Sequence, residues 1–347
     1  MYERLAEIVK GIEELERQRG ELSERLRSKS ELFPEALEKE LTKKIEPKKL
    51  NLKVAAVDGG LLAQEFHGFD LVVARAVAVL FEYQDSLLAG HKYHPRAFAE
   101  VEIDVMSALE SHDYNWHKGL FRLKKELEIA CEGVEKFEPE FMLLDGSIVP
   151  LVSDKPADDS PVHGSYVQVI SLYKKLYETC EKKGCTLAGV IKDSRGKRFV
   201  EILQKKFRDE RILEKSSDTS LIHFLLKTGE RTFAFNYSAD PAKNQVLRDL
   251  SEWGRKINAF YIKPVEKDRP LRVEFLDGKH SFDEIASVIY SLSRINKNYG
   301  YPAVLIEADM RAALDKVELE RAYRELFMKL GMRSSIMPLR RDSRPFR

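Results

Sequence analysis

The chain has 347 residues, of which 43% are hydrophobic, so it can bury one large core or two modest ones. It carries 58 Lys and Arg against 57 Asp and Glu, and this balance neither supports nor excludes a nucleic-acid partner. No apolar run approaches the roughly 18 residues of a membrane-spanning helix, and the charged N-terminus predicts that no signal peptide is present. Cys131, Cys180 and Cys185 have neither a CxxC nor a zinc-finger spacing, so we interpret them as reduced thiols of a cytoplasmic protein.

Residues 1–46 are predicted to be helical and strongly charged. Apolar residues fall on heptad a and d positions, with Arg19 in the one remaining place: Leu5, Ile8, Ile12, Leu15, Leu22 and Leu26. Three heptads are marginal for a coiled coil, so we expect an amphipathic helix that packs on its own domain or on a second subunit. Pro34 and Pro47 interrupt the segment, which predicts an irregular or short-helical connection over 30–50.

The core is predicted to open with strands. The apolar run 54–57 and the β-branched run 71–81 are typical of buried strands, and the alternation at 98–103 suits a strand with one solvated face. Short links between them favour an antiparallel meander. A helix is expected over 113–136, with Leu120, Leu127 and Val134 on its buried stripe.

The second half of the chain alternates strands and helices. A strand at 141–147, a helix at 163–182 and a strand at 186–191 complete a β-β-β-α-β-α-β order whose later strands should be parallel. Residues 197–228 look helical. Short strands at 232–236, 259–263 and 271–275 are interpreted as a second hairpin-rich sheet, followed by a helix at 281–295 and helical segments to about 331.

Two of the predicted strands end in the same way. Val54–Val57 is followed by Asp58-Gly59-Gly60, and Phe141–Leu144 is followed by Asp145-Gly146-Ser147. Asp-Gly is also good turn chemistry, which is the alternative interpretation of each copy. Together the two motifs predict that both carboxylates meet at one edge of one sheet.

Carboxylates in such a place can hold a hard divalent cation, because Mg²⁺ and Mn²⁺ prefer oxygen ligands. The helix at 113–136 offers Glu126 or Glu128 as a third ligand, and Glu126 lies on the face that adjoins the apolar stripe. Either glutamate is equally consistent with a solvated helix surface. Lys192 follows the strand at 186–191. We interpret it either as a phosphate contact or as an ordinary exposed lysine at the end of a strand. HExxH, P-loop, GxGxxG and GxSxG motifs are all missing from the sequence, which disfavours zinc hydrolases, ATPases, dehydrogenases and α/β-hydrolases.

These patterns resemble a known family. Carboxylates on the first strand, the helix and the fourth strand are the pattern of ribonuclease H-like nucleases. The sequence motifs themselves resemble those of the NurA family, archaeal nucleases that work with the hexameric HerA translocase. The motifs that carry the resemblance are Val57-Asp58-Gly59-Gly60, Leu143–Ser147, Gly189–Ser194, and Tyr301-Pro302 followed by Glu307-Ala308. They span about 50 to 315. The resemblance implies an α/β fold with a ribonuclease H-like mixed sheet flanked by helices. It also implies three parts: a helical N-terminal extension (1–50), a nuclease domain (51–331) with additional C-terminal strands and helices, and a basic tail (332–347).

The resemblance also implies site residues and partners. The family's catalytic and metal-binding positions fall on Asp58, Glu126 or Glu128, Asp145 and Tyr301, and Asp309 stands where the family usually has histidine. Lys192 and Arg195 are expected to contact DNA. The cofactor implied is Mn²⁺, with Mg²⁺ as the alternative, at two ions per site. The partners implied are DNA, a HerA-type hexameric ATPase and a second copy of the chain.

The function expected is therefore metal-dependent hydrolysis of DNA. The family implies a 5′–3′ exonuclease with endonuclease activity that acts in end resection and double-strand break repair. In a two-metal mechanism one ion activates the attacking water and the other stabilises the leaving oxygen. Asp58 would bridge the ions, while Asp145 and the helix glutamate complete their ligand shells. The alternative is an inactive ribonuclease H-like clamp or scaffold for a translocase, which the aspartate at 309 favours.

Overall fold

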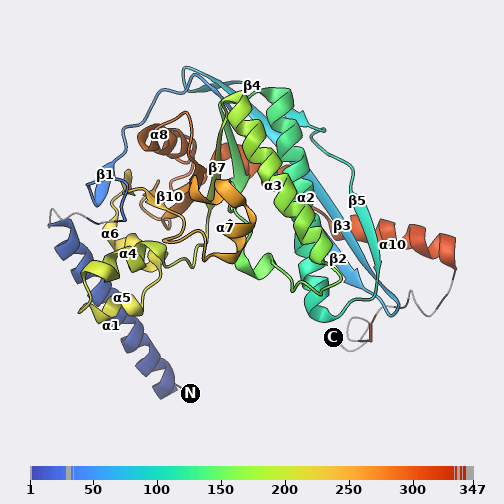
Figure 1. Ribbon diagram of the computed structural model, residues 1–347, viewed down its shortest axis with the longest axis horizontal. Coiled ribbons are helices and arrows are strands. Elements are labelled where there is room, and N and C mark those ends of the chain that lie inside the picture. The colour runs from blue at the N-terminus through green and yellow to red at the C-terminus, as the bar shows by residue number, and fades with distance from the viewer. Residues whose placement is uncertain are drawn as a thin grey trace.

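One mixed sheet of eleven strands forms the centre of the molecule, with helices on both of its faces (Figure 1). The computed structural model describes residues 2–28, 33, 35–331, 333, 337 and 339–340. Most of the predicted basic tail at 332–347 lies outside the described residues. None of the described helices combines the length and the apolar character that crossing a lipid bilayer requires.

The strands follow the order β1-β8-β10-β11-β7-β6-β2-β3-β4, with β5 paired to β3 and β9 paired to β10. Their bounds are β1 Thr42–Lys44, β2 Lys53–Glu65, β3 Phe69–Gln84, β4 Leu87–His94, β5 Glu102–Ser107, β6 Phe141–Asp145, β7 Thr186–Ile191, β8 Glu230–Thr232, β9 Phe235–Asn236, β10 Ile257–Lys263 and β11 Leu271–Leu276. Strands β6 and β7 run parallel to β2, while β3 and β11 are antiparallel to their neighbours.

The α-helices are α1 Tyr2–Arg27, α2 Ser111–Phe137, α3 His163–Lys183, α4 Arg198–Lys206, α5 Arg211–Glu214, α6 Asp218–Leu225, α7 Gln245–Asp249, α8 Phe282–Leu292, α9 Ala303–Ala312 and α10 Lys316–Leu330. Two short 3₁₀ helices are η1 Val152–Asp154 and η2 Ser251–Arg255.

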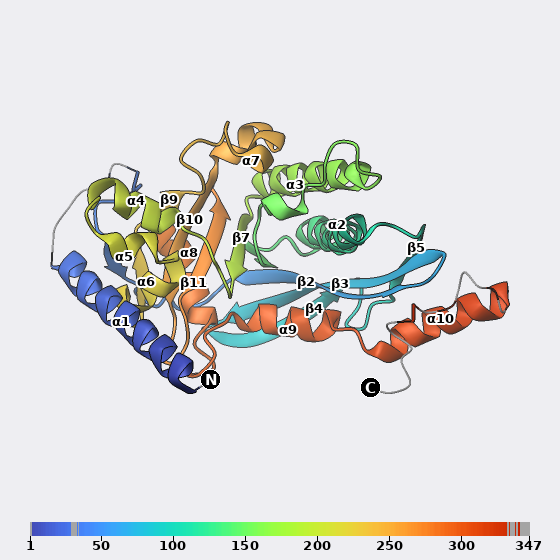
Figure 2. The ribbon, with the colours of Figure 1, turned by 90° about the horizontal axis from the view of Figure 1, so that it is seen from below.

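Helices α2 and α3 cover one face of the sheet, and α9 lies on the other (Figure 2). The strand period of two sorts the residues of β2 between these layers. Ala55 and Val57 pack in the core cluster that contains α2 and α3, whereas Val54 and Ala56 pack in the cluster that contains α8 and α9. Because both faces of the sheet are covered, the sequence of β2 begins with a continuous apolar run rather than an alternation of apolar and polar residues.

The predicted mixed sheet with parallel later strands and flanking helices is confirmed, and three details of its first half are corrected. Strand β2 does not end at Asp58 but continues to Glu65, because β3 pairs with it along its whole length. The strand expected at 98–103 lies at 102–107, as β5. The edge strand β4 was not predicted: most of its side chains are exposed or only half-buried, so its sequence carries no apolar alternation.

The prediction of a second sheet is wrong. Strand β11 pairs antiparallel with β7, with Val273 opposite Val190, and thereby joins the C-terminal strands to the central sheet. The region 197–228 is not one helix but three, α4, α5 and α6.

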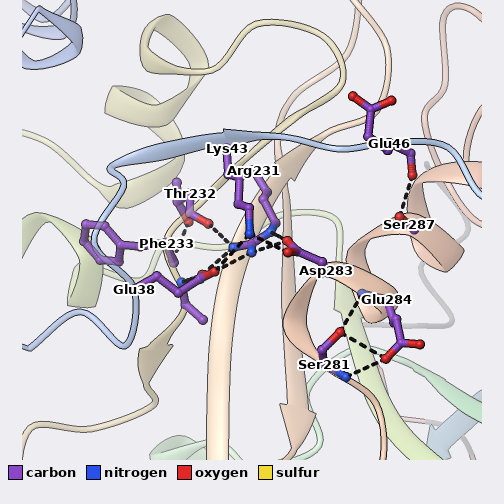
Figure 3. A network of polar contacts seen from close by, with 11 residues as sticks. Glu38, Lys43, Glu46, Arg231, Thr232, Phe233, Ser281, Asp283, Glu284 and Ser287 are labelled. Carbon is purple, nitrogen blue, oxygen red and sulfur yellow. Dashed lines mark hydrogen bonds and ion pairs between the residues drawn. The ribbon is translucent and has the colours of Figure 1, made fainter.

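The segment before β2 is tied to the sheet by a buried charge. Arg231 on β8 is fully buried, and its guanidinium donates to Glu38 and to Asp283 at the start of α8 (Figure 3). Lys43 on β1 forms an ion pair with the same Asp283. Strand β1, which the sequence did not predict, is therefore held at the sheet edge by polar contacts as well as by its pairing with β8.

Helix α1 packs against α5 and α6 only through its second half. Leu22 and Leu26 are buried there, as the heptad spacing predicted for a helix packed on its own domain. In the first half Leu5, Ile8 and Ile12 are about half exposed, so this part of the apolar stripe has no cover within the described chain.

Candidate active site

Strands β2 and β6 place Asp58 and Asp145 side by side. The parallel register pairs Val57 with Leu144, so the next residue of each strand is one of the two aspartates. Strand β6 ends at Asp145, while β2 continues toward its hairpin with β3. By strand alternation both side chains belong to the sheet face that α8 and α9 cover.

Glu126 reaches the same place from the opposite face, from helix α2. Gly59 makes this approach possible, because a Cβ atom at residue 59 would stand 2.6 Å from the Oε1 atom of Glu126. Glu128 lies elsewhere: its carboxylate pairs with Lys125, which also pairs with Glu102 on β5. Of the two helix glutamates that the sequence offered, the structure therefore brings Glu126 to the aspartates.

The neighbouring carboxylates perturb one another's ionisation. Burial, followed by the charges of Asp145 and Glu126, raises the pKa of Asp58 to about 8. Burial raises the pKa of Glu126 to about 7, an effect that Arg122 opposes and Asp145 reinforces. Carboxyl groups with pKa values this high are destabilised as anions, so the site favours a compensating positive charge.

Asp145 is held by two side chains that the sequence analysis had singled out. The Nζ atom of Lys192 donates to its Oδ2 atom at 2.8 Å, and the hydroxyl of buried Tyr301 donates toward its Oδ1 atom at 2.9 Å. The ammonium of Lys192 also lies 4.3 Å from the centroid of the Tyr301 ring. The hydrogen bond to Asp145 and its charge outweigh burial and raise the pKa of Lys192.

The two remaining predicted residues lie at the margin of this cluster. Asp309 on α9 is exposed, and its charge contributes to the raised pKa of Asp58. Arg195 is exposed on the loop after β7. It does not contact the carboxylates in any described interaction.

Two hollows lie near the carboxylates. The larger hollow, of about 850 Å³, lies toward α2 and α3 and is lined by Arg122, Glu126, Asp145 and Arg195, among others. The smaller hollow, of about 270 Å³, is lined by Lys192, Arg269, Tyr299 and Tyr301, among others. Asp193 lines both hollows, so they adjoin at the loop that follows β7.

The donor set fits a hard divalent cation. The Oε1 atom of Glu126 is buried without a hydrogen-bond partner in the described structure, although Arg122 lies 3.4 Å from it. Carboxylate oxygens that are buried and incompletely satisfied are ligands that Mn²⁺ and Mg²⁺ prefer. In the described residues no three acidic, His or Cys side chains are already arranged around one point, and Asp145 is directed to Lys192 and Tyr301 instead. Each oxygen of Asp145 accepts one of these hydrogen bonds and keeps a second lone pair that can bind an ion.

Three further residues shape the site: Gly59 and Gly60 of the motif that follows β2's apolar run, and Arg122, to which the sequence analysis gave no role. A Cβ atom at residue 60 would clash with the backbone carbonyl of Ala312 at the end of α9, which explains why this chain has glycine there. Arg122 precedes Glu126 by four residues, a spacing that places both on one helix face and was visible in the sequence. The two glycines indicate a close approach, but the sequence does not show that Glu126 and Ala312 are the residues that approach them.

Solved structures share this fold. The chain is similar to the NurA nuclease from Sulfolobus solfataricus, with 17% identity over 95% of this chain and 96% of that one and a TM-score of 0.61. A structure of NurA bound to dAMP and manganese matches with 11% identity over 96% and 98% of the two chains and a TM-score of 0.59. A structure of NurA with manganese matches with 12% identity over 84% and 92% and a TM-score of 0.55. None of the curated proteins matches by sequence.

The mixed sheet, with β6 and β7 parallel to β2 and helices on both faces, has a ribonuclease H-like fold. The sequence profile of the NurA domain matches residues 52–314, which is most of the chain. The chain belongs to the NurA family, as its motifs had indicated.

Proposed function

We propose that this protein is a metal-dependent nuclease that hydrolyses phosphodiester bonds in DNA. The observation that carries the proposal is the cluster of Asp58, Glu126 and Asp145, whose members come from two strands and a helix and whose proximity contributes to the raised pKa values of Asp58 and Glu126. Asp58 is buried and the other two are only partly exposed, and carboxyl groups perturbed in this way are typical of functional sites. Similarity to NurA structures that contain manganese or dAMP supports the same proposal.

In this proposal Asp58, Glu126 and Asp145 hold two Mn²⁺ ions, with Mg²⁺ as the alternative. Such ions, when bound, lower the pKa of an attacking water and stabilise the leaving oxygen. Glu128 is not assigned a role, because its carboxylate is paired with Lys125.

The remaining residues act on the substrate and on the ligands. Tyr301 orients Asp145 through its hydroxyl. Lys192 is assigned as a phosphate contact, and a substrate phosphate would compete with Asp145 for its ammonium group. Arg195 is exposed and lines the larger hollow, so it would contact the DNA strand further along. Asp309 can add a negative charge near Asp58, but it cannot donate a proton as a histidinium would.

The finer assignments follow the family resemblance. We infer a 5′–3′ exonuclease with endonuclease activity that acts in DNA end resection and double-strand break repair, works with a HerA-type hexameric ATPase, and forms a homodimer in the cytoplasm. The half-exposed apolar residues on the first half of α1 support a protein partner for that helix, because an exposed apolar stripe marks a contact surface.

The test is release of labelled nucleotides from linear DNA with Mn²⁺ and with EDTA. Asp58→Asn and Asp145→Asn should each reduce the rate by more than the roughly 10- to 100-fold that loss of a residue supporting a metal ligand costs. Both should leave DNA binding nearly unchanged, since phosphate contacts come mainly from Lys and Arg. Wild-type protein that binds DNA but releases nothing with any divalent metal would exclude the nuclease and favour a DNA clamp.

A further inference from the structure

The smaller hollow contains an aromatic side chain that the proposed chemistry does not use. Tyr299 is 42% exposed, and its ring lies 5.9 Å from that of Tyr301, centroid to centroid, at an angle of 44°. Tyr301 is itself bonded to Asp145. The exposed ring is therefore one side chain away from the carboxylate that the proposed mechanism depends on.

The turn that carries Tyr299 is fixed in place. The amide of Gly300 donates to the Oδ2 atom of Asp268 at 2.8 Å, and a Cβ atom at residue 300 would stand 2.9 Å from the side chain of Val265. The turn thus packs tightly against the connection between β10 and β11. A turn that is already ordered loses little backbone entropy when a ligand binds to a side chain that it carries.

The hollow has the size and the chemistry for one flat ligand. Its volume of about 270 Å³ lies near the lower end of small-molecule pockets, which favours a single base over a longer segment. Lys192 lines it from the side of the carboxylates, and Arg269 from the rim. Arg269 pairs with Asp193 at 3.3 Å, but both side chains are mostly exposed, so this ion pair is weak and its cation is accessible to a phosphate.

We propose that the smaller hollow binds one nucleobase of the DNA strand, adjacent to the phosphate that is cut, and that the base stacks on Tyr299. This inference rests on the proposed nuclease function. Stacking on an aromatic ring is tolerant of sequence, because every base has a π face. Tyr299 is in this sense a positioning residue: it holds the strand so that the neighbouring phosphate lies at Lys192 and Asp145.

The test uses a single strand that carries the fluorescent base 2-aminopurine at the first, second or third position from either end. The full-length Asp58→Asn protein serves as the parent, so that the strand is bound without being cut. Binding should quench the fluorescence at one of these positions. Adding Tyr299→Ala should abolish that quenching and weaken binding about 5- to 100-fold, whereas Tyr299→Phe should retain both.

A matched control is Phe224→Ala, which removes an aromatic side chain of similar exposure from α6 and should behave as the parent does. In protein with the native Asp58, Tyr299→Ala should raise KM by the same factor without changing the pH profile of cleavage. The inference is overturned if Tyr299→Ala binds and quenches as the parent does, or if Tyr299→Phe loses as much as Tyr299→Ala.

The outcomes separate this inference from the proposed function. Wild-type protein that cuts DNA, with a Tyr299→Ala variant that is unchanged, refutes the base site alone. A strand that is bound and quenched through Tyr299 but is never cut refutes the nuclease and leaves the base site standing. Wild-type protein that neither binds nor cuts DNA refutes both.

Discussion

Glu126 of helix α2 lies against the backbone of Gly59 in strand β2, where a Cβ atom would stand 2.6 Å from its Oε1 atom. Gly59→Ala should therefore displace the glutamate from the aspartates and reduce nuclease activity by at least the roughly 10- to 100-fold typical of a lost ligand-supporting residue. The fold should persist, because the displaced atoms are the end of a flexible side chain. The measurement is the cleavage rate with Mn²⁺ beside the thermal unfolding midpoint.

Gly164→Ala in α3 is the control for this substitution, since nothing lies within 4 Å of the added methyl group. It should retain activity. Full activity in Gly59→Ala would show that the reaction does not need Glu126 in its present place.

The two glutamates of α2 should differ sharply in their effect on activity. Glu126→Gln removes a charge from the cluster of Asp58 and Asp145, and we expect a loss comparable to that of Asp58→Asn. Glu128→Gln breaks only a contact with Lys125, whose other partner Glu102 remains, so its activity should stay within about twofold of wild type. Cleavage assays on both variants decide the matter; equal effects would contradict the assignment.

The elements of the site that could be predicted are those with a local signal. The apolar runs that end in Asp58 and Asp145, and the apolar stripe beside Glu126, are each contained within about ten residues. The glycine at 59 matters only because α2 crosses β2 at that point, and no short stretch of sequence records the crossing.

The same distinction explains the errors in the fold. Strand β4 lies at a sheet edge with side chains that are mostly exposed or half-buried, so its composition does not differ from that of a loop. The strands after residue 230 were located by their apolar character, but their membership of the central sheet depends on the pairing of β11 with β7, about 80 residues earlier in the chain. Such non-local pairing is a property of the folded chain and has no sequence signature.

Metal-free protein should lose stability as the pH rises. The folded-state pKa values of Asp58 and Glu126, about 8 and about 7, exceed the ordinary values near 4. Between about pH 4 and pH 8 the folded state therefore binds more protons than the unfolded state, so the free energy of unfolding falls as the pH rises. Each carboxyl group contributes a slope of up to about 1.4 kcal/mol per pH unit.

Denaturant unfolding in EDTA across this range measures the slope. Asp58→Asn should flatten it and should be more stable than wild type at pH 8, while Glu128→Gln should match wild type. Mn²⁺ should stabilise wild type at pH 8, since a ligand that binds only the folded state stabilises it. Identical slopes for wild type and Asp58→Asn would refute this account of the acidic cluster.

The first half of α1 should contribute to the proposed homodimer. Leu5, Ile8 and Ile12 form one stripe and are each about half exposed. Replacing all three with Gln should shift the sedimenting species from dimer to monomer at micromolar concentration, because the contact loses its apolar surface. Glu7→Gln with Lys10→Gln, on the opposite side of the same helix, should leave the dimer intact. A wild-type protein that sediments as a monomer, or a triple variant that remains dimeric, would exclude this surface as the dimer contact.

The buried guanidinium of Arg231 should be important for stability but not for the chemistry. It is fully buried and donates to Glu38 at 2.6 Å and to Asp283, so its removal leaves partly buried carboxylates without their partner (Figure 3). Arg231→Met should therefore lower the free energy of unfolding by about 3–5 kcal/mol. Lys43→Met removes another cation from the same Asp283, but this pair is largely exposed, so it should cost at most about 1 kcal/mol. The denaturation midpoints of the two variants and of wild type measure the difference. An Arg231→Met variant within 1 kcal/mol of wild type would mean that packing and the β1–β8 pairing alone hold residues 35–46 to the sheet.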